Sequence, residues 1–158
     1  MFESFIDASS REYGVPVSWI QAVIQTESSW NPNAYNASDP GGARGLMQII
    51  AATARAYGVT NLSDLFDPAT NIDIGTHLLS DIAQGLHVIN WDSADFRRVY
   101  SAYNSGNPDK WETSSQVAAN VQRALGALAN WTTSNPGTSS GIGLLLVGVV
   151  IWKVFFRS

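Results

Sequence analysis

The chain has 158 residues, which suffice for one domain with a hydrophobic core but not for two. Hydrophobic residues make up 45% of the chain and charged residues 14%, a composition that excludes an intrinsically disordered protein. The absence of cysteine excludes disulfides and thiolate metal sites, and a net charge of -4 without a lysine or arginine cluster argues against a nucleic-acid partner.

Residues 1–131 are expected to form one all-α domain. Hydrophobic periodicity and helix-ending residues predict six helices in this part of the chain. A long polar loop rich in helix breakers is expected at residues 30–45, and no strand is expected anywhere. The first predicted helix covers residues 2–13 and ends before Gly14, and the second begins at residue 16 and carries residue 27. The fourth covers residues 68–85 and begins after the N-cap Asp67. The third, fifth and sixth cover residues 46–57, 92–104 and 114–131.

The C-terminal end differs in composition from the domain before it. All 13 acidic residues lie before position 113, so residues 1–138, with seven basic side chains, carry a net charge of -6. The residues from 139 onward carry +2. Residues 141–152 are all apolar or glycine, and Lys153 and Arg157 flank a further apolar triplet. Residues 132–140 form a flexible linker by composition.

We predict a single-pass transmembrane helix at residues 141–156. Sixteen helical residues span about 24 Å, short of the roughly 30 Å hydrocarbon core, but a lysine can extend to the membrane surface. An apolar helix packed in the core is the alternative. The membrane is favoured because the stretch is apolar around its whole circumference and ends in a basic flank. The N-terminus "MFESFIDASS" has no basic start and no long apolar run, so it is not a secretory signal.

Glu27 occupies an unexpected place in the second predicted helix. Counting back by three, four and seven residues gives Ile24, Val23 and Ile20, which share one helix face with it. A carboxylate on an apolar stripe is costly unless it is paired or functional. Because apolar surroundings raise the pKa of a carboxyl group, Glu27 is a candidate general acid near neutral pH. The alternative is an ordinary glutamate that reaches solvent at a helix end.

Five short motifs follow one another in the order typical of one enzyme family. They are "ES" at 27–28 with "WNPNA" at 30–34, "GARGLMQI" at 42–49, "TA" at 53–54, "DP..NI..G" at 67–75 and "AYNSG" at 102–106. Each is weak alone, but together they resemble the catalytic domain of soluble lytic transglycosylases. These relatives of goose-type lysozyme cut the glycan strands of peptidoglycan. The similarity runs from about residue 10 to 125 and implies a lysozyme-like helical bundle with a glycan cleft.

The resemblance also implies which residues carry the function. Glu27 is the single catalytic acid and base. Two features depart from the family pattern: "SQVAANV" in the last predicted helix lacks the common Tyr-Val pair, and "GTHLL" stands where Tyr-Leu is common. Both departures bear on substrate contacts more than on the catalytic step. Substrate contacts are implied for Ser28, Met47, Gln48, Tyr103 and Asn104.

The family chemistry needs one carboxyl group. In lytic transglycosylases the acid protonates the glycosidic oxygen while the substrate's N-acetyl group assists the departure. The same carboxylate then takes the proton of the sugar's C6 hydroxyl, which gives a 1,6-anhydro product without consuming water. Most glycosidases use a second carboxylate, for which Asp39 is the nearby candidate, although its place in "SDPGG" favours a role in a turn. No cofactor and no metal are expected, since His77 and His87 lack metal-ligand spacing.

Three other side chains, Trp30, Trp111 and Arg44, are further candidates for contacts with the substrate. Trp30 and Trp111 lie beside motifs and can stack on sugar faces, but tryptophan is more often a core residue. Arg44 can meet the carboxylates of peptidoglycan. The glycines of residues 41–45 lack a nucleotide-binding pattern, so a phosphate site is not expected.

These observations predict a membrane-anchored peptidoglycan lytic transglycosylase that cleaves the MurNAc–GlcNAc β-1,4 bond. The alternatives are a hydrolytic lysozyme acting on the same bond and a non-catalytic structural or glycan-binding protein. The expected partners are peptidoglycan strands, the lipid bilayer around residues 141–156, and other virion proteins. Because a wall enzyme without a signal peptide needs another route to its substrate, we hypothesise a phage virion membrane, with the enzyme opening the wall at infection. The bacterial inner membrane facing the periplasm is the alternative location.

Overall fold

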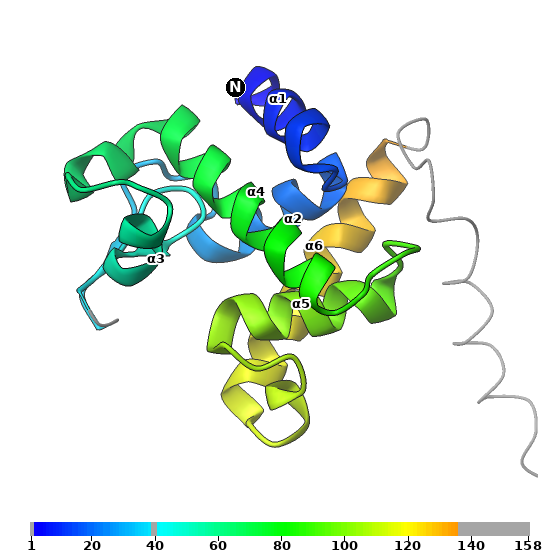
Figure 1. Ribbon diagram of the computed structural model, residues 1–158. Coiled ribbons are helices and arrows are strands. Elements are labelled where there is room, and N and C mark those ends of the chain that lie inside the picture. The colour runs from blue at the N-terminus through cyan, green and yellow to red at the C-terminus, as the bar shows by residue number, and fades with distance from the viewer. Residues whose placement is uncertain (1, 39–40, 136–158) are drawn as a thin grey trace, which may run out of the picture.

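The computed structural model describes residues 2–38 and 41–135 (Figure 1). This part of the chain is mostly helical, with three very short strands between the second and third α-helices. In chain order the elements are α1 (Glu3–Tyr13), α2 (Val17–Ser28), β1 (Tyr35–Asn36), β2 (Ala43–Arg44), β3 (Ile49–Ile50), α3 (Ala51–Ala56), the 3-10 helix η1 (Leu62–Phe66), α4 (Pro68–Gly85), α5 (Ser93–Ser105), the 3-10 helix η2 (Lys110–Glu112) and α6 (Ser115–Ser134).

Helix α4 crosses the middle of the molecule (Figure 1). Helix α1 packs against α4, α2 packs against α6, and α5 contacts both α4 and α6. Trp19 of α2 is fully buried, and its ring meets the rings of Trp91 and Phe96 edge-on, each at a centroid distance of 4.8 Å. The helices therefore share one hydrophobic core, and the predicted helical bundle is confirmed.

Several helix ends lie where the sequence predicts them, for the expected reasons. Gly14 ends α1 in the left-handed conformation with φ of 70°. Asp67 accepts a hydrogen bond of 2.9 Å from the backbone N–H of Thr70, which satisfies an amide that α4 itself leaves unpaired. That bond and a second one from the Thr70 hydroxyl lower the pKa of Asp67.

The segment predicted as the third helix has a different structure. Residues 46–48 form a turn, Ile49 and Ile50 form β3, and α3 begins only at Ala51. The backbone of Gln48 has a φ of 50°, so a right-handed helix cannot continue through it. The expectation of an all-α chain without strands is thus wrong in this region. Strands of two residues are too short to produce an alternating pattern in the sequence.

The three strands form a small antiparallel sheet in the order β1-β2-β3. Tyr35 pairs with Arg44, and Ala43 pairs with Ile50. The left-handed Gly42, with φ of 73°, lies where any Cβ would come within 2.5 Å of the Tyr35 ring. Glycine at this position therefore lets Tyr35 lie close against the neighbouring strand.

The last helix is longer than predicted. Helix α6 continues to Ser134, so the first three residues of the predicted linker are helical. The remaining linker residues from 136 onward, the predicted transmembrane helix at 141–156, and Asp39 lie outside the described residues. Within residues 2–38 and 41–135, no helix combines the length and apolar character needed to cross a membrane.

Asn71 of α4 joins the turn at residues 46–48 to the helical core. Its side chain is fully buried and makes three hydrogen bonds. Oδ1 accepts from the backbone N–H of Met47 at 2.7 Å, and Nδ2 donates to the carbonyls of Arg44 at 2.9 Å and Leu65 at 2.8 Å. One side chain thus bonds three backbone groups of the turn and the segments beside it.

Two glycines allow the turn to approach α4 closely. A Cβ on Gly45, whose φ is 76°, would lie 2.2 Å from the Leu65 carbonyl oxygen. A Cβ on Gly75 of α4 would lie 2.4 Å from the sulfur of Met47. The glycines of the second and fourth sequence motifs therefore have a packing role, because they leave room for the turn that carries Met47.

We predict that Asn71→Ala lowers the free energy of unfolding by roughly 2–4 kcal/mol, because it removes three hydrogen bonds to the backbone and adds a cavity. Urea unfolding at neutral pH measures this effect. The exposed Asn90→Ala is the matched control and is expected to change stability by less than about 0.5 kcal/mol. Equal effects of the two substitutions would show that Asn71 does not organise the turn.

Two glycine substitutions in the same helix are expected to have opposite signs. Gly75→Ala forces its new methyl group against Met47 and should destabilise the fold by roughly 1–3 kcal/mol. Gly85→Ala meets no atom within 4 Å and should stabilise α4 by up to about 1 kcal/mol through helix propensity. Thermal unfolding of both variants measures this difference, and a Gly75→Ala variant as stable as Gly85→Ala would contradict it.

Candidate active site

Glu27 lies in the last turn of α2, at the end of the predicted apolar stripe. Ile20, Val23 and Ile24 are fully buried, as expected, whereas the Glu27 side chain is half-buried. The next two residues, Ser29 and Trp30, both have left-handed backbones, with φ of 52° and 66°. The chain therefore turns sharply after α2, and Glu27 remains at the edge of the core.

The phenol of Tyr100 in α5 donates a hydrogen bond of 2.7 Å to Oε1 of Glu27. Tyr100 is almost completely buried, and its ring stacks with Phe96 at 5.9 Å and with Tyr103 at 6.3 Å. Burial, followed by the negative charge of Glu27 and the hydrogen bond to it, raises the pKa of Tyr100 far above its ordinary value of 10. Tyr100 is therefore a permanent hydrogen-bond donor to the carboxyl group across the whole physiological pH range.

Tyr103, one turn further along α5, holds the turn at residues 46–48 rather than the acid. Its hydroxyl donates a hydrogen bond of 2.7 Å to the backbone carbonyl of Met47. Desolvation first, then the charges of Glu27 and Tyr57, raise the pKa of Tyr103 well above 10. Tyr103 is thus near enough to Glu27 to feel its charge, but its hydroxyl is engaged elsewhere.

Met47 and Gln48, both expected to line the glycan cleft, have largely structural contacts. The Met47 side chain is fully buried beneath Gly75, and its predicted substrate contact stays a prediction. The half-buried Gln48 donates through Nε2 to the carbonyls of Ala34 at 3.2 Å and Gly45 at 3.0 Å. These bonds close the loop between α2 and β3, which explains why a residue with a left-handed backbone is held there.

Ser28 and Asn104 are also bonded within the protein. The Ser28 hydroxyl donates to the carbonyl of Ile24 in its own helix at 3.1 Å. Asn104 accepts through Oδ1 a hydrogen bond of 3.1 Å from Nδ2 of Asn120 in α6, and Asn120 in turn accepts from Arg123. Asn104 therefore connects the end of α5 to α6 beside Tyr103, while the Ser28 hydroxyl turns back to its own backbone.

Arg44 and Trp111 both have contacts within the protein, while their predicted contacts with glycan or peptidoglycan stay predictions. Arg44 donates through Nη1 to the carbonyls of Gly41 at 2.7 Å and Gly42 at 2.8 Å, and its guanidinium lies 5.0 Å from the centroid of the Tyr35 ring. Trp111 packs under Arg97 at 4.8 Å. Arg44 thus stabilises the loop before β2, and Trp111 joins η2 to α5.

The two histidines lie outside this site. His77 stacks on Tyr13 with a centroid distance of 4.6 Å and lies 3.7 Å from Asp81. His87 has a left-handed backbone with φ of 55° just after α4.

Tyr100 is the residue that sequence reasoning missed. A usable signal was present, because Tyr100 precedes Tyr103 by three residues and so lies on the same face of α5. The sequence does not show which of the two hydroxyls reaches the carboxyl group. That choice depends on how α5 is rotated against α2, which is a tertiary property.

The fold of this chain matches that of solved structures. The chain is similar to the crystal structure of the 70 kDa soluble lytic transglycosylase of Escherichia coli, with a TM-score of 0.70 and 24% identity, over 87% of this chain and 25% of that one. It is equally similar to an inactive mutant of the lytic transglycosylase Slt of Pseudomonas aeruginosa, with a TM-score of 0.71 and 21% identity, over 89% of this chain and 25% of that one. At these identities the likeness shows a shared fold.

Residues 4–125 match the transglycosylase SLT domain family, and the chain therefore belongs to that family. It is also 43% identical over 108 residues to the membrane-bound lytic murein transglycosylase C of Shigella sonnei (strain Ss046). That match covers 62% of this chain and 29% of the relative, so the chain spans well under half the length of the protein it matches. The family predicted from the five motifs is thus confirmed.

The raised pKa values of Tyr100 and Tyr103 predict a specific loss of stability in alkali. A tyrosine whose folded pKa exceeds its unfolded value of about 10 contributes stability below that pH and loses it as the pH rises further. Tyr100→Phe removes one such group but keeps the ring. We expect its free energy of unfolding to fall less than that of the wild type between about pH 9 and 11. Urea unfolding measures both proteins over this pH range. Equal decreases in the free energy of unfolding of Tyr100→Phe and the wild type would contradict a raised pKa of Tyr100.

Proposed function

We propose that this chain is a peptidoglycan lytic transglycosylase that cleaves the MurNAc–GlcNAc β-1,4 bond and forms a 1,6-anhydro product. The observation that carries the proposal is the half-buried Glu27, hydrogen-bonded to Tyr100, in a chain whose residues 4–125 match the transglycosylase SLT domain. The proposed catalytic residue is Glu27. The proposed substrate-contact residues are Ser28, Met47, Gln48, Tyr103 and Asn104.

In the proposed reaction Glu27 first acts as an acid. Its proton passes to the glycosidic oxygen as the bond from that oxygen to C1 of MurNAc breaks, and the N-acetyl group of the same sugar assists the departure. Glu27, now a carboxylate, then removes the proton of the C6 hydroxyl while O6 bonds to C1. The proton balance closes on one residue, so neither a second carboxylate nor a water molecule is needed.

The position of Glu27 supports this role. At the C-terminal end of α2, the negative end of the helix dipole disfavours a carboxylate, as do the buried residues beside it. The hydrogen bond from Tyr100 acts in the opposite direction, because it stabilises the ionised form. Opposing effects on its ionised form suit the Glu27 carboxyl group to the proposed reaction, in which it first gives a proton and then takes one back. The raised pKa predicted for Glu27 from the sequence stays a prediction.

A hydrolytic lysozyme is the nearest competing function. It would need a water molecule at C1, whereas the proposed reaction uses the C6 hydroxyl of the substrate itself. A non-catalytic glycan-binding protein is the alternative from another class. The hydrogen bond from Tyr100 to Glu27 favours an enzyme over a glycan-binding protein. A surface that only binds glycan does not require a buried tyrosine that donates to a half-buried carboxyl group.

We further propose that residues 141–156 anchor the domain to a membrane. The support comes from the apolar run with its basic flank, and from the relative from Shigella sonnei, which is described as membrane-bound. A phage virion membrane, with the enzyme opening the wall at infection, is the more specific hypothesis. Purified particles should then contain the chain and release it with detergent, and its absence from every particle fraction would exclude a virion role.

Glu27→Gln is expected to reduce lysis of purified cell walls by at least about a thousandfold, because the amide keeps the shape but has no acidic proton to transfer. A turbidity assay measures the rate. The matched control is Glu12→Gln, an exposed glutamate at the end of α1, which should lyse walls at the wild-type rate. Equal lysis by Glu27→Gln and wild type would refute the proposed catalytic role.

The product distinguishes the two enzyme classes. Mass spectrometry of the digested walls should show fragments whose reducing-end sugar is lighter by one water than the hydrolysis product, because the C6 hydroxyl closes the ring on C1. Digestion by a known muramidase provides the unmodified reference. Fragments of unmodified mass would make this chain a hydrolase.

A further inference from the structure

Ile89, in the loop between α4 and α5, is the most exposed large hydrophobic side chain among the residues that the structure describes. It is 82% exposed, compared with 55% for Tyr35 and 40% for Phe5. From residue 86 to residue 91 this loop contains no acidic residue, lysine or arginine. A single exposed hydrophobic residue needs no explanation by itself, so the position of the loop in the fold decides what Ile89 can do.

The loop of residues 86–91 is packed against the beginning of α2. The ring of the half-buried Trp91 meets the ring of the fully buried Trp19 edge-on, at a centroid distance of 4.8 Å. At the other end of the loop, the backbone N–H of Val88 donates a hydrogen bond of 2.9 Å to the carbonyl of Ala83 in α4. Ile89 therefore lies at the surface between two points at which the loop is held to the core.

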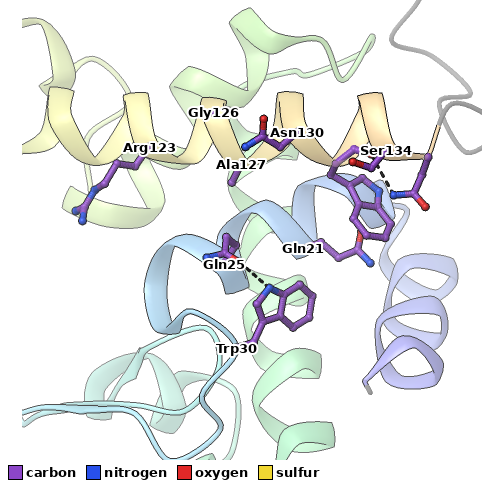
Figure 2. A pocket seen from close by; sticks show the side chains of 10 residues that line it. Gln21, Gln25, Trp30, Arg123, Gly126, Ala127, Asn130 and Ser134 are labelled. Atoms are coloured by element: carbon purple, nitrogen blue, oxygen red, sulfur yellow. Dashed lines mark hydrogen bonds between the residues drawn. The ribbon is translucent and has the colours of Figure 1, made fainter.

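The last turns of α6 lie at the same end of α2. Gln21, two residues after Trp19, lines one groove together with Ser134 near the end of α6. Figure 2 shows Gln21 on the side of Ser134, whereas Gln25, one turn further along α2, lies opposite Ala127. The two helices are thus antiparallel, and the loop that carries Ile89 lies at the end of the molecule where α6 ends.

The loop and α6 carry little charge, although the domain as a whole is acidic. Arg123 is the one charged residue of α6. Asp92, directly after the loop, accepts hydrogen bonds from the backbone N–H groups of Ala94 at 2.8 Å and Asp95 at 2.9 Å, so its carboxylate is directed to the N-terminus of α5. An anionic bilayer repels acidic side chains, but α6 and the loop present none of their own to it.

The length of chain after α6 restricts how the domain can lie on a membrane. The proposed membrane anchor begins at residue 141, six residues after Asn135. Six residues extend at most about 20 Å. A domain of this size has a radius of gyration of about 14 Å, and hence a diameter of roughly 35 Å. With residues 141–156 in the bilayer, the end of α6 therefore stays on the membrane side of the domain.

We propose that the loop of residues 86–91 contacts the lipid bilayer, with Ile89 as the side chain that enters the membrane interface. This inference rests on the proposed membrane anchor at residues 141–156. The contact removes the apolar side chain of Ile89 from water and places Trp91 near the headgroups, where tryptophan is favoured. Glu27 lies about 12 Å further along α2 than Trp19, and so farther from the bilayer than the loop.

The test uses the full-length chain in vesicles of phosphatidylethanolamine and phosphatidylglycerol. Because the chain has no cysteine, Asn90→Cys introduces a unique site for a nitroxide spin label next to Ile89. Power-saturation spectroscopy compares collisions of the label with oxygen, which concentrates in the bilayer, and with a polar nickel complex, which stays in water. We expect the ratio of oxygen to nickel collisions to be at least about threefold higher than for a label at Ala56→Cys. Ala56 is exposed in α3, which lies on the opposite side of the molecule from the end of α6 (Figure 1).

Substitution of Ile89 separates its own effect from that of the label. In the Asn90→Cys chain, Ile89→Asp should lower the collision ratio to the value at Ala56, whereas Ile89→Leu should preserve it. Because Ile89 is 82% exposed, both variants should keep the melting temperature of the parent. A ratio that Ile89→Asp leaves unchanged would show that Ile89 does not make the contact.

Flotation of the vesicles on a density gradient tests the anchor separately. If the chain floats with the vesicles but the labels at residues 90 and 56 give equal ratios, the membrane-contact loop is refuted and the anchor stands. If the chain does not float, the anchor and the loop proposal are refuted together. Neither measurement involves cleavage of glycan, so the proposed catalytic role of Glu27 is unaffected by either result.

Discussion

The rest of the site depends on three hydrogen bonds that the Asn71 side chain makes with the backbone of Met47, Arg44 and Leu65. They hold the backbone of Met47 against α4, in a space that two glycines leave open. The carbonyl of Met47 then receives the hydroxyl of Tyr103, whose ring stacks on Tyr100, and Tyr100 donates to Glu27. A buried asparagine on one helix is thereby linked, through a turn and a second helix, to a carboxyl group on a third.

This series of contacts explains why the family motifs contain the residues they do. One packing unit beneath the site combines Asn71 and Gly75 of the fourth motif with Gly45 and Met47 of the second. The side chains of Asn71 and Met47 are fully buried. The proposed chemistry resides in Glu27, while most of the neighbouring motif residues hold the backbone that brings Tyr100 and Tyr103 to it. Precise placement of a single carboxyl group requires such support.

The sequence predicts the helices well because they carry strong local signals, such as the Asp67 cap and the stop at Gly14. It also predicts Glu27 and its family, since the order of motifs is a property of the chain itself. The sequence does not predict the small sheet or the short α3. Both follow from the left-handed backbone of Gln48, which is held by side-chain hydrogen bonds to the carbonyls of Ala34 and Gly45. The buried position of Met47 and the bond from Tyr100 likewise depend on tertiary packing.

The most direct test of the account is a crystal structure of the Glu27→Gln chain with a peptidoglycan tetrasaccharide bound. The account predicts that the amide of residue 27 lies within hydrogen-bond distance, about 3 Å, of one glycosidic oxygen between MurNAc and GlcNAc. Tyr100 should still contact residue 27 in that complex. A glycan bound with every glycosidic oxygen far from residue 27 would contradict the claim that this carboxyl group is the catalytic acid.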